Sequence, residues 1–497
     1  MTAPAALLVV GDALLDHDVS GRVERLAPDA PVPVVSGTRR ATRPGGAALT
    51  ACLAAADGRP VTLITALGDD PDSAALRDLL TDRVHLVELP LDGALSSKTR
   101  VLADGRPLLR LDDGEGRARE STHEAVRAIT EADAVLVSDY GRGTADVLRE
   151  ALAGAAARIP VVWDPHPRGM PPVPGARLAT PSAAEAHALA DRTEDRDDTE
   201  QRGPRGELRT AAQDAGRLVR AWRVASVAVT LGGRGALLSH GGTPLLVPSP
   251  VTAEGDACGA GDRFAATAAG LLADGELAET AVRAAVHAAT RYVAEGGVRS
   301  LATATTATGT TAPQPQDAPT DDALRTAARV RAAGGTVVAA GGCFDLLHAG
   351  HVALLQAARR TGDCLVVCVN SDASVRRRKG DGRPLVPEAD RIRVLRALEC
   401  VDAVAVFDED TPERLLAELR PHIWAKGGDY ALERLPEAPL VESWGGQVVL
   451  FPYLDGRSTT GIAERAALTP RPPSTPLTPA TARGRRRPMP VAERRDE

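Results

Sequence analysis

The residues best suited to chemistry lie in a Gly-rich segment of the chain's second half. Residues 341–351 (GGCFDLLHAGH) follow an apolar run and precede a helix-forming stretch. His348 and His351, three residues apart at the predicted helix start, are expected to face the same pocket as the helix N-terminus. Imidazole N–H groups there can bind nucleotide phosphates and stabilise charge at a reacting phosphorus. A metal pair competes with this interpretation, although the neighbouring residues complete no plausible ligand set, and helix capping is the structural alternative.

A second segment with chemical potential is residues 256–264 (DACGAGDRF), which precedes the helical stretch AATAAGLLADG. The small residues Gly259, Ala260 and Gly261 allow backbone N–H groups to approach an anion, and the helix N-terminus adds positive potential. Asp262 at that position can take the proton of an attacking hydroxyl. For this segment alone, a Gly-rich turn with Asp as the helix N-cap is the structural alternative.

Two α/β bodies must position these segments, because short aliphatic runs alternate with longer helical stretches in both halves of the chain. The first half contains LLVVGD, VTLITALGD, AVLVSD, PVVWD and VASVAVTLGG, and the second contains GTVVAAGGCFD, CLVVCVNSD, AVAVFDED, HIWAKGGD and QVVLFPY. Many of these runs end in Gly, Asp or Asn, as expected where the carboxyl ends of parallel strands carry a ligand site. The sequence therefore predicts two α/β domains with largely parallel sheets.

Composition sets the expected boundaries within the 497 residues. A Thr-, Ala- and Pro-rich run over 300–320 is typical of an interdomain linker. The charged segment 191–207 contains few apolar residues and is expected to be a surface insertion, and the Pro- and Arg-rich end of the chain favours disorder. The predicted parts are a first domain over 1–300, a linker over 301–332, a second domain over 333–466 and a disordered tail over 467–497.

Bulk properties exclude several function classes. The net charge of -7 argues against a general nucleic-acid binder, and no apolar run approaches the roughly 20 residues that span a bilayer. The six cysteines are scattered without a CxxC pair, as expected for reduced thiols in a cytoplasmic protein without a zinc site. We expect a cytoplasmic homodimer that acts on small molecules, with neither nucleic acid nor membrane as a partner.

Lysine is rare, since only three of the 59 basic residues are lysines. In an arginine-rich chain, a remaining lysine is expected where a planar guanidinium cannot replace a compact ammonium group. Lys98, Lys379 and Lys426 are therefore candidate functional residues, with chance retention as the alternative.

Eight segments of the first domain occur in an order typical of one enzyme family. They are GDALLD, RLAPDAPVPVV, PGGAA, KTRVL, LLRLD, SDYGRG, TLGGRG and GDACGAGD. This ordered set covers most of residues 5–300. It resembles the ribokinase-like (PfkB) sugar kinases and, more closely, the kinase half of the bifunctional heptose 7-phosphate kinase/heptose 1-phosphate adenylyltransferases. Two positions depart from the family pattern, because Leu49 replaces the Asn of GGAAN and Ser182 replaces the Asn of TPN-x-x-E.

The resemblance implies roles for the matching residues of the first domain. Asp262 is implied as the catalytic base, and the backbone of Gly259, Ala260 and Gly261 as the anion hole for the transferred phosphoryl group. Phosphoryl transfer suits such a site, because it needs mainly positioning and charge stabilisation, with Mg²⁺ bridging the phosphates of ATP. The other implied residues are Asp12, Asp16, Gly45, Gly46, Lys98 and Arg100 at the sugar, and Ser182, Glu185, Thr230, Gly232 and Gly235 at ATP.

The second domain resembles the HxGH signature of the cytidylyltransferase-like nucleotidyltransferase superfamily, which implies a Rossmann-like fold. The later segments NSD, RKGDGRP, KGGDY and RSTTGI sharpen this into a resemblance to heptose 1-phosphate adenylyltransferase over about residues 334–466, with Gly341 where the family has Asn. His348, His351 and Lys426 are implied to act on the phosphates in an in-line displacement. The implied nucleotide-binding residues are Cys343, Phe344, Asp345, Asn370, Asp372, Lys379, Arg383, Ser458 and Thr459.

Together the two resemblances imply one enzyme with two sequential activities. The first domain would phosphorylate D-glycero-D-manno-heptose 7-phosphate at its anomeric hydroxyl with ATP, giving the 1,7-bisphosphate. After a separate phosphatase has acted, the second domain would adenylylate heptose 1-phosphate, giving ADP-heptose and pyrophosphate. Mg²⁺ is the implied cofactor, carried with ATP and not by a side-chain cluster. The alternatives are the same chemistry on a different sugar phosphate, or a sugar-nucleotide sensor or scaffold with an inactive domain.

Overall fold

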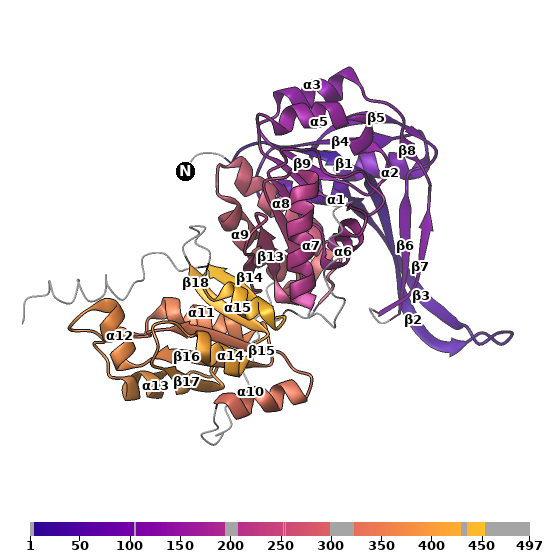
Figure 1. Cartoon of the computed structure of the whole chain (residues 1–497). Helices are drawn as coiled ribbons and strands as arrows, with labels where there is room; N and C mark the ends of the chain where they lie inside the picture. Colours follow the sequence, from indigo (N-terminus) through magenta and orange to yellow (C-terminus); the bar gives the residue numbers. More distant parts are fainter. Residues whose placement is uncertain are drawn as a thin grey trace, which may run out of the picture.

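The computed structural model contains two α/β bodies (Figure 1) and describes residues 4–103, 106–193, 207–251, 253, 255–298, 323–428 and 435–452. The strands of the first body are β1 (Leu7–Gly11), β2 (Ala13–Leu26), β3 (Pro33–Gly46), β4 (Val61–Leu67), β5 (His85–Asp92), β6 (Ser97–Ala103), β7 (Arg106–Asp113), β8 (Arg117–Ala118), β9 (Val135–Ser138), β10 (Val161–Asp164), β11 (Leu178–Ala179), β12 (Val227–Thr230), β13 (Ala236–Ser239) and β14 (Leu245–Val247). Its helices are α1 (Ala47–Ala56), α2 (Pro71–Leu80), α3 (His123–Glu131), α4 (Thr144–Val147), α5 (Arg149–Ala156), α6 (Ala183–Ala190), α7 (Glu207–Trp222), the short 3₁₀ turn η1 (Gly232–Arg234), α8 (Ala260–Ala273) and α9 (Ala278–Ala294).

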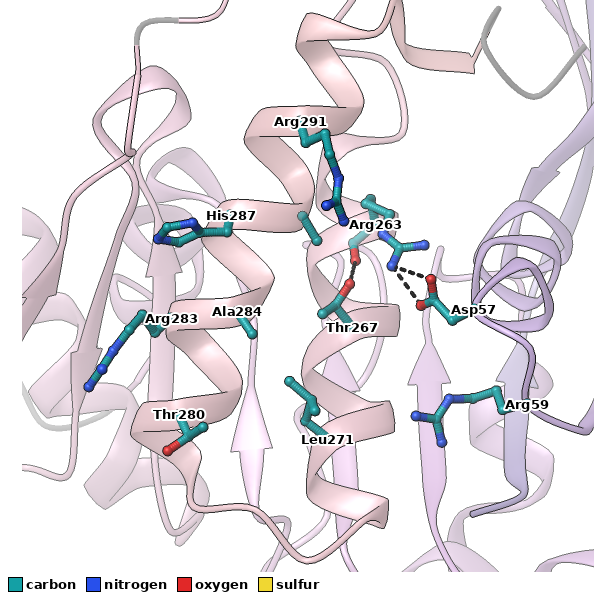
Figure 2. Close-up of a pocket in the computed structure, with 11 residues that line it drawn as sticks. Asp57, Arg59, Arg263, Thr267, Leu271, Thr280, Arg283, Ala284, His287 and Arg291 are labelled. Atoms are coloured by element: carbon teal, nitrogen blue, oxygen red, sulfur yellow. Dashed lines mark hydrogen bonds and ion pairs between the residues drawn. The ribbon is translucent and has the colours of Figure 1, made fainter. Parts of the chain in front are cut away.

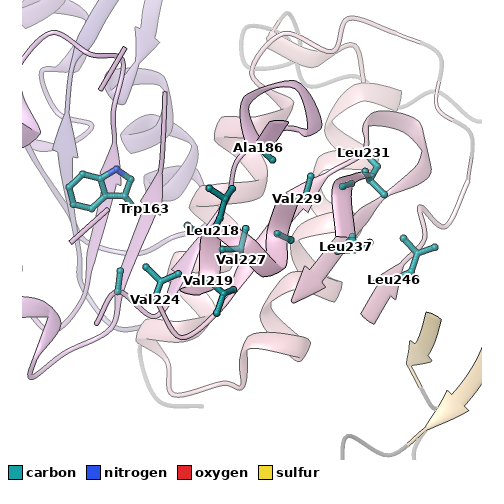
Figure 3. Packing of buried hydrophobic residues seen from close by; sticks show 14 of the residues in the cluster. Trp163, Ala186, Leu218, Val219, Val224, Val227, Val229, Leu231, Leu237 and Leu246 are labelled. Atoms are coloured by element: carbon teal, nitrogen blue, oxygen red, sulfur yellow. The ribbon is translucent and has the colours of Figure 1, made fainter. Parts of the chain in front are cut away.

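The main sheet of the first body is parallel from β5 through β4, β1, β9, β10 and β11 to β12. Its apolar runs are continuous because helices cover both faces. In β1, for example, Leu8 and Val10 pack into the core on the side of α3, α5, α6 and α7, whereas Leu7 and Val9 pack toward α1, α8 and α9. Figure 3 shows part of the first core, which includes Leu218 of α7 and Val227 of β12. The predicted parallel α/β architecture is confirmed.

A second sheet of four strands projects from this body, in the order β3-β2-β6-β7 (Figure 1). β2 and β3 form a long antiparallel hairpin, and β2 also pairs in parallel with β6. Every residue of β7 is exposed, including Leu109 and Leu111. The sequence patterns did not predict this sheet, because its strands are mixed polar and apolar and lack the continuous apolar runs of the main sheet.

The second body is a parallel sheet in the order β17-β16-β15-β18-β19. Its edge meets the first body where Leu245 of β14 pairs with Leu450 of β19, and Arg360 donates to the carbonyl oxygen of Ser249 at 3.1 Å. Its strands are β15 (Val337–Gly342), β16 (Cys364–Asn370), β17 (Ala403–Phe407), β18 (Ile423–Gly428) and β19 (Gln447–Pro452). Its helices are α10 (Ala323–Ala332), α11 (Ala349–Arg359), α12 (Asp372–Lys379), α13 (Glu388–Arg396), α14 (Glu413–Leu419) and α15 (Ala438–Ser443).

Helix α10 corrects one boundary, because it occupies the last ten residues of the linker expected over 301–332. Ala323 and Ala327 are buried in one core with strands β15 and β16, so this helix is part of the second body. The prediction was wrong here because the apolar face of α10 consists mainly of alanines and is hard to distinguish from the Ala-rich run before it. The insertion expected over 191–207 lies mostly outside the described residues, and the tail expected over 467–497 lies entirely outside them.

Candidate functional site

The first candidate site is built around the start of α8, at the carboxyl edge of the main sheet. Gly259 precedes the helix with a φ of 80°, a conformation that favours glycine. A Cβ on Gly259 would also lie 2.7 Å from the hydroxyl oxygen of Tyr292 and 2.9 Å from Cδ2 of Leu49. The N–H of Ala260 donates to the carbonyl oxygen of Ala257 at 3.1 Å. Ala260 and Gly261 line an adjacent pocket, so the predicted anion hole opens onto a cavity, and its role stays a prediction.

Asp262 is the third residue of α8, and its side chain is directed into the protein. Its Oδ1 atom accepts hydrogen bonds from the hydroxyls of Thr50 at 2.6 Å and Tyr140 at 3.0 Å. Burial raises the pKa of the Asp262 carboxyl to about 6, although these two hydrogen bonds oppose the effect by stabilising the carboxylate. A general base works best with a pKa near the working pH. The geometry therefore suits the predicted base, and Thr50 and Tyr140 are contacts that the sequence patterns missed.

A pocket of about 390 Å³ lies beside this helix start and contains most of the predicted ATP residues. It is lined by Ser182, Thr230, Gly232 and Gly235. Ser182 and Thr230 are also joined by an isolated parallel β-bridge. Glu185 does not line the pocket but fixes Ser182 through a capping box, in which the N–H and hydroxyl of Ser182 donate to Oε2 of Glu185. The structure thus brings the predicted ATP residues together, although their contact with ATP stays a prediction.

The predicted sugar residues gather where β2 and β6 pair, with Asp16 in register with Lys98. Asp16 forms ion pairs with Arg43 at 2.6 Å and with Arg100 at 3.4 Å. The ammonium group of Lys98 lies 5.3 Å from the ring centre of Tyr140, and burial lowers the pKa of this lysine. Arg43 was missed because it lies in a strand of the projecting sheet, where no motif marks it.

Asp12 and the glycines Gly45 and Gly46 form the inner wall of this region. Both carboxylate oxygens of Asp12 accept backbone hydrogen bonds, from Tyr140, Arg142 and Thr144 at 2.8 to 3.1 Å. The observed task of Asp12 is therefore to hold the loop that carries Tyr140. A Cβ on Gly45 would lie 2.8 Å from Oδ2 of Asp16, which explains why glycine is needed there. Direct sugar contacts of these residues stay predictions.

A separate groove of about 570 Å³ lies between α8 and α9, away from these residues. Its basic side chains do not converge on one point, since Figure 2 shows Arg283 and His287 directed away from α8. On the other side of the groove, Arg263 is fixed by two hydrogen bonds to Asp57. This cavity is larger than the pocket at the start of α8, but none of the predicted site residues line it.

The second candidate site lies at the start of α11, as predicted, with His348 as the N-cap residue. The rings of His348 and His351 are stacked with centroids 3.9 Å apart, and Phe344 lies 5.2 Å from His351. Burial, together with the neighbouring charges of His348 and Lys379, lowers the pKa of His351 to about 4. Such a pair is suited to meeting an anion, because phosphate oxygens would accept hydrogen bonds from both rings.

Buried ionic groups hold the loops around these histidines. Asp345 accepts hydrogen bonds from the side chain of Arg383 at 2.7 Å and from the backbone N–H groups of Leu385 and Val386. Burial raises the pKa of the Asp345 carboxyl, but these bonds outweigh it and the net shift is downward. Asp345 and Arg383 therefore fix the basic loop to the histidine segment, and their contact with nucleotide stays a prediction.

Arg391 is a buried residue of α13 that the sequence patterns missed. Its guanidinium donates to the carbonyl oxygens of Cys343 and Asn370 at 2.6 and 2.9 Å and to the carboxylate of Asp372 at 2.7 Å. It therefore joins the ends of β15 and β16, which carry predicted nucleotide-binding residues. An arginine in an Arg-rich helix gives no sequence signal of this task.

Lys426 ends up beside a buried carboxylate. Its ammonium group donates to Oε1 of Glu437 at 3.1 Å and lies 5.2 Å from the ring centre of Trp424. Glu437 was not predicted, because it lies in none of the motifs of this domain. The remaining two predicted residues, Ser458 and Thr459, lie outside the described residues.

Two features are absent from the residues that the structure describes. No helix there is long and apolar enough to cross a membrane. In the same residues, no group of three or more His, Cys, Asp or Glu side chains is arranged to hold a metal ion.

Comparison with known proteins identifies both bodies. The model of the pfkB family carbohydrate kinases matches residues 5–305, and the cytidylyltransferase-like model matches residues 339–447. The chain is 64% identical to the bifunctional protein HldE of Streptomyces coelicolor, covering 94% of this chain and 99% of the relative. It is 37% identical to the HldE proteins of Koribacter versatilis (93% and 96% covered) and Gluconobacter oxydans (92% and 96% covered). The chain therefore belongs to the family of bifunctional HldE proteins, in which a carbohydrate kinase is fused to a nucleotidyltransferase.

Proposed function

We propose that the two reactions of this bifunctional enzyme take place at the start of α8 and at the start of α11. The chain is a sugar kinase and an adenylyltransferase of ADP-heptose biosynthesis. It phosphorylates D-glycero-D-manno-heptose 7-phosphate to the 1,7-bisphosphate, and it transfers an adenylyl group from ATP to heptose 1-phosphate. The observation that carries the residue assignment is the buried carboxylate of Asp262, which lies in the first turn of α8 beside the pocket and interacts with Lys98 on the sugar side.

In the kinase reaction, Asp262 takes the proton of the anomeric hydroxyl while that oxygen attacks the γ-phosphorus of ATP. The start of α8, with Gly259, Ala260 and Gly261, stabilises the transferred phosphoryl group, because backbone N–H groups and the helix dipole favour an anion there. Lys98 and Arg100 bind the sugar phosphate, and Arg43 extends this group of cations.

In the transferase reaction, the phosphate of heptose 1-phosphate attacks the α-phosphorus of ATP and pyrophosphate leaves. His348 and His351 donate to the oxygens of the α-phosphate as charge builds up on them. Lys379 and Lys426 neutralise the remaining phosphates as compact point charges. Arg391 acts through the strand ends and keeps Cys343, Asn370 and Asp372 in position.

We further propose that Mg²⁺ accompanies ATP, and the kinase site fits such a cation. Burial raises the pKa of the Asp164 carboxyl well above its usual range, and the neighbouring Asp262 adds to this effect. The carboxyls of Asp164, Asp262 and Glu185 lie close enough to influence one another, and a divalent cation would favour their ionised forms by offsetting this repulsion. Glu185 would help to hold the ion from just outside the pocket lining, because its Oε2 atom is fixed by Ser182, which lines the pocket. Bound Mg²⁺ would neutralise charge on the transferring phosphates.

A different sugar phosphate is the second candidate substrate, and Leu49 favours it. Leu49 packs against Gly259, so an apolar side chain lies where the family pattern has Asn. Turnover measured on a panel of sugar 7-, 6- and 5-phosphates (roughly equal concentrations, same MgATP) distinguishes the two. Turnover of heptose 7-phosphate above all others supports the proposal, and its absence beside good turnover of another sugar refutes the heptose assignment. Ligand binding without any turnover at either site would identify a sensor.

We also propose a cytoplasmic homodimer that assembles through the projecting sheet. The supporting observation is the exposure of Leu109 and Leu111 of β7, at 54% and 47%, together with Leu26 and Val32 at the hairpin. Exposed apolar patches of this kind commonly mark protein interfaces. Sedimentation of the native chain is expected to give a dimer, and Leu109→Asp is expected to give a monomer.

A further inference from the structure

We infer that Thr50 and Tyr140 are positioning residues of the kinase reaction, which hold Asp262 by its Oδ1 atom and leave its Oδ2 atom to accept the proton of the sugar hydroxyl. This inference rests on the proposed kinase function. The inference adds to that function two residues, Thr50 and Tyr140, which lie outside the Gly-rich motif around Asp262. It also names the oxygen atom of Asp262 that accepts the proton.

The hydrogen bonds to Asp262 are distributed unequally between its two oxygens. Oδ1 accepts both hydroxyl protons, from Thr50 at 2.6 Å and from Tyr140 at 3.0 Å. Oδ2 accepts no hydrogen bond from the described residues. It is also absent from the fully buried polar atoms that lack a partner, so it is not sealed off from the surroundings. An oxygen that already accepts two hydrogen bonds is a poorer proton acceptor, because its lone pairs are occupied. Oδ2 is therefore the atom available for the reaction.

Thr50 makes this bond because of its place on α1. Its side chain is fully buried, and its single hydroxyl proton has three acceptors within reach. The carbonyl oxygen of Gly46 and the hydroxyl oxygen of Ser138 each lie 3.3 Å away, and the carboxylate of Asp262 lies at 2.6 Å. A charged acceptor at the shortest distance forms the strongest of these bonds. Thr50 directly follows Leu49, which occupies the position of the Asn in the family pattern. A polar side chain is therefore present one residue later in this chain.

Tyr140 is itself held from several sides, as a positioning group must be. Its backbone N–H donates to Asp12 at 3.0 Å, and its ring stacks on His166 with centroids 6.1 Å apart. The ammonium group of Lys98 lies 5.3 Å from the ring centre. With the ring fixed in this way, the hydroxyl can hold the carboxylate of Asp262 in one orientation.

The reaction balances with this assignment. The O–H bond of the anomeric hydroxyl breaks, its proton moves to Oδ2 of Asp262, and its oxygen forms a bond to the γ-phosphorus. The bond between the γ-phosphorus and the bridging oxygen breaks, and ADP leaves with the electron pair. The hydroxyls of Thr50 and Tyr140 stay on Oδ1 throughout, and Asp262 returns the proton to solvent after the product has left.

The test compares full-length Thr50→Val and Tyr140→Phe with the native enzyme, using heptose 7-phosphate and MgATP from about pH 5 to about pH 8. Each variant removes one hydroxyl with little change of shape. We expect kcat to fall about tenfold and both KM values to stay within about twofold. The acidic limb of the kcat profile should move to higher pH, because the lost donor no longer stabilises the carboxylate. The charged and titratable groups that also influence Asp262 are Asp16, Lys98, Asp164 and Tyr292, and they are unchanged in both variants.

Two further variants and one internal control keep the result interpretable. Thr50→Ser keeps the hydroxyl and should recover most of the native rate. Ser138→Ala removes a neighbour of Thr50 that does not contact Asp262, so its pH profile should match the native one. Adenylyltransferase activity of each protein, measured in the same sample, reports the amount of intact second body and so normalises the kinase rates. Because the substrate phosphate also titrates near pH 6, the readout is the difference between the native and variant profiles.

Superimposable profiles with unchanged kcat in Thr50→Val and Tyr140→Phe would overturn the inference. A protein without activity on any sugar phosphate would instead refute the proposed function. In that case, resonance titration of isotope-labelled aspartate carboxyl groups, assigned with Asp262→Asn, still decides the matter. An upward shift of the Asp262 titration in both variants supports the positioning role, and an unchanged titration refutes it.

Discussion

In the kinase domain the proposed reacting group is one buried carboxylate held by hydroxyls, whereas in the transferase domain the proposed groups are imidazoles and ammonium groups. Asp262 receives two hydrogen bonds before any substrate binds. His348 and His351 instead stack on each other at 3.9 Å, and burial keeps the pKa of His351 near 4. The first site is arranged around a negative charge, and the second is arranged to receive one.

This difference teaches where each reaction obtains its stabilisation. A sugar hydroxyl must lose a proton to become a good nucleophile, so the kinase needs a base of tuned pKa. A sugar phosphate is already an anion at neutral pH, so the transferase needs no base and depends on donors and cations around the α-phosphate. Because the two sites share no residue, variants of one can be measured against the other in the same molecule.

The largest expected effect comes from Asp262→Asn. This change keeps the shape of the side chain and removes the base, so kinase kcat should fall at least about a thousandfold. Adenylyltransferase activity should stay within about twofold of the native value. Both activities are measured on one sample, by ADP release with heptose 7-phosphate and by pyrophosphate release with heptose 1-phosphate. A kinase rate above one tenth of the native rate would exclude Asp262 as the base.

The corresponding test of the transferase site uses His348→Ala and His351→Ala. Each removes a donor to the α-phosphate, and transferase kcat should fall about a hundredfold, as for other donors to a developing oxyanion. The kinase rate serves as the control and should not change. If the two single variants and the double variant are equally impaired, the rings act as one unit, as their stacking suggests. A transferase that keeps native activity in either single variant would contradict the assigned roles.

The strands and the Gly-rich segments of both sites could be predicted from the sequence, because apolar runs and helix starts leave local patterns. LLVVGD became β1 and GTVVAAGGCFD became β15, and the parallel pairing followed from the residues at their ends. Thr50, Tyr140 and Glu437 could not be predicted as site residues. Each reaches its partner from a segment far away in the chain or from one without a motif, and only tertiary packing brings the side chains together.

The prediction for the segment that forms helix α10 failed for a related reason. Its burial depends on small residues such as Ala323 and Ala327, whose hydrophobic signal is weak, and the composition of the neighbouring run dominated the prediction. The projecting sheet was not predicted because exposed strands lack the alternation of apolar and polar residues that a buried face imposes. In both cases the missing information concerned what the segment packs against.

A smaller effect is expected at Lys426, where the transferase site contains its own buried ion pair. Lys426→Arg keeps the charge but replaces a compact ammonium group by a planar fork, so most transferase activity should be lost, about tenfold or more. Glu437→Gln keeps Lys426 and weakens its anchor, so a loss of about threefold to tenfold is expected. Near-native pyrophosphate release by Lys426→Arg would refute the need for a compact ammonium group. Thermal unfolding of each variant controls for misfolding.

The smallest effect is expected for Leu49→Asn, which restores the residue of the family pattern at a buried position of the kinase site. If Thr50 and Tyr140 hold the base as inferred, residue 49 does not contact the reacting carboxylate, and kinase kcat should change by less than about fivefold. Leu49→Ala is the matched control, since it removes the packing against Gly259 without adding a polar group and should loosen the helix start. A gain of more than about tenfold in kcat/KM for heptose 7-phosphate in Leu49→Asn alone would mean that the apolar side chain has shifted the native preference toward another sugar. In that case the arrangement around the base would be kept, whereas the sugar pocket beside it would have changed to accept a different sugar.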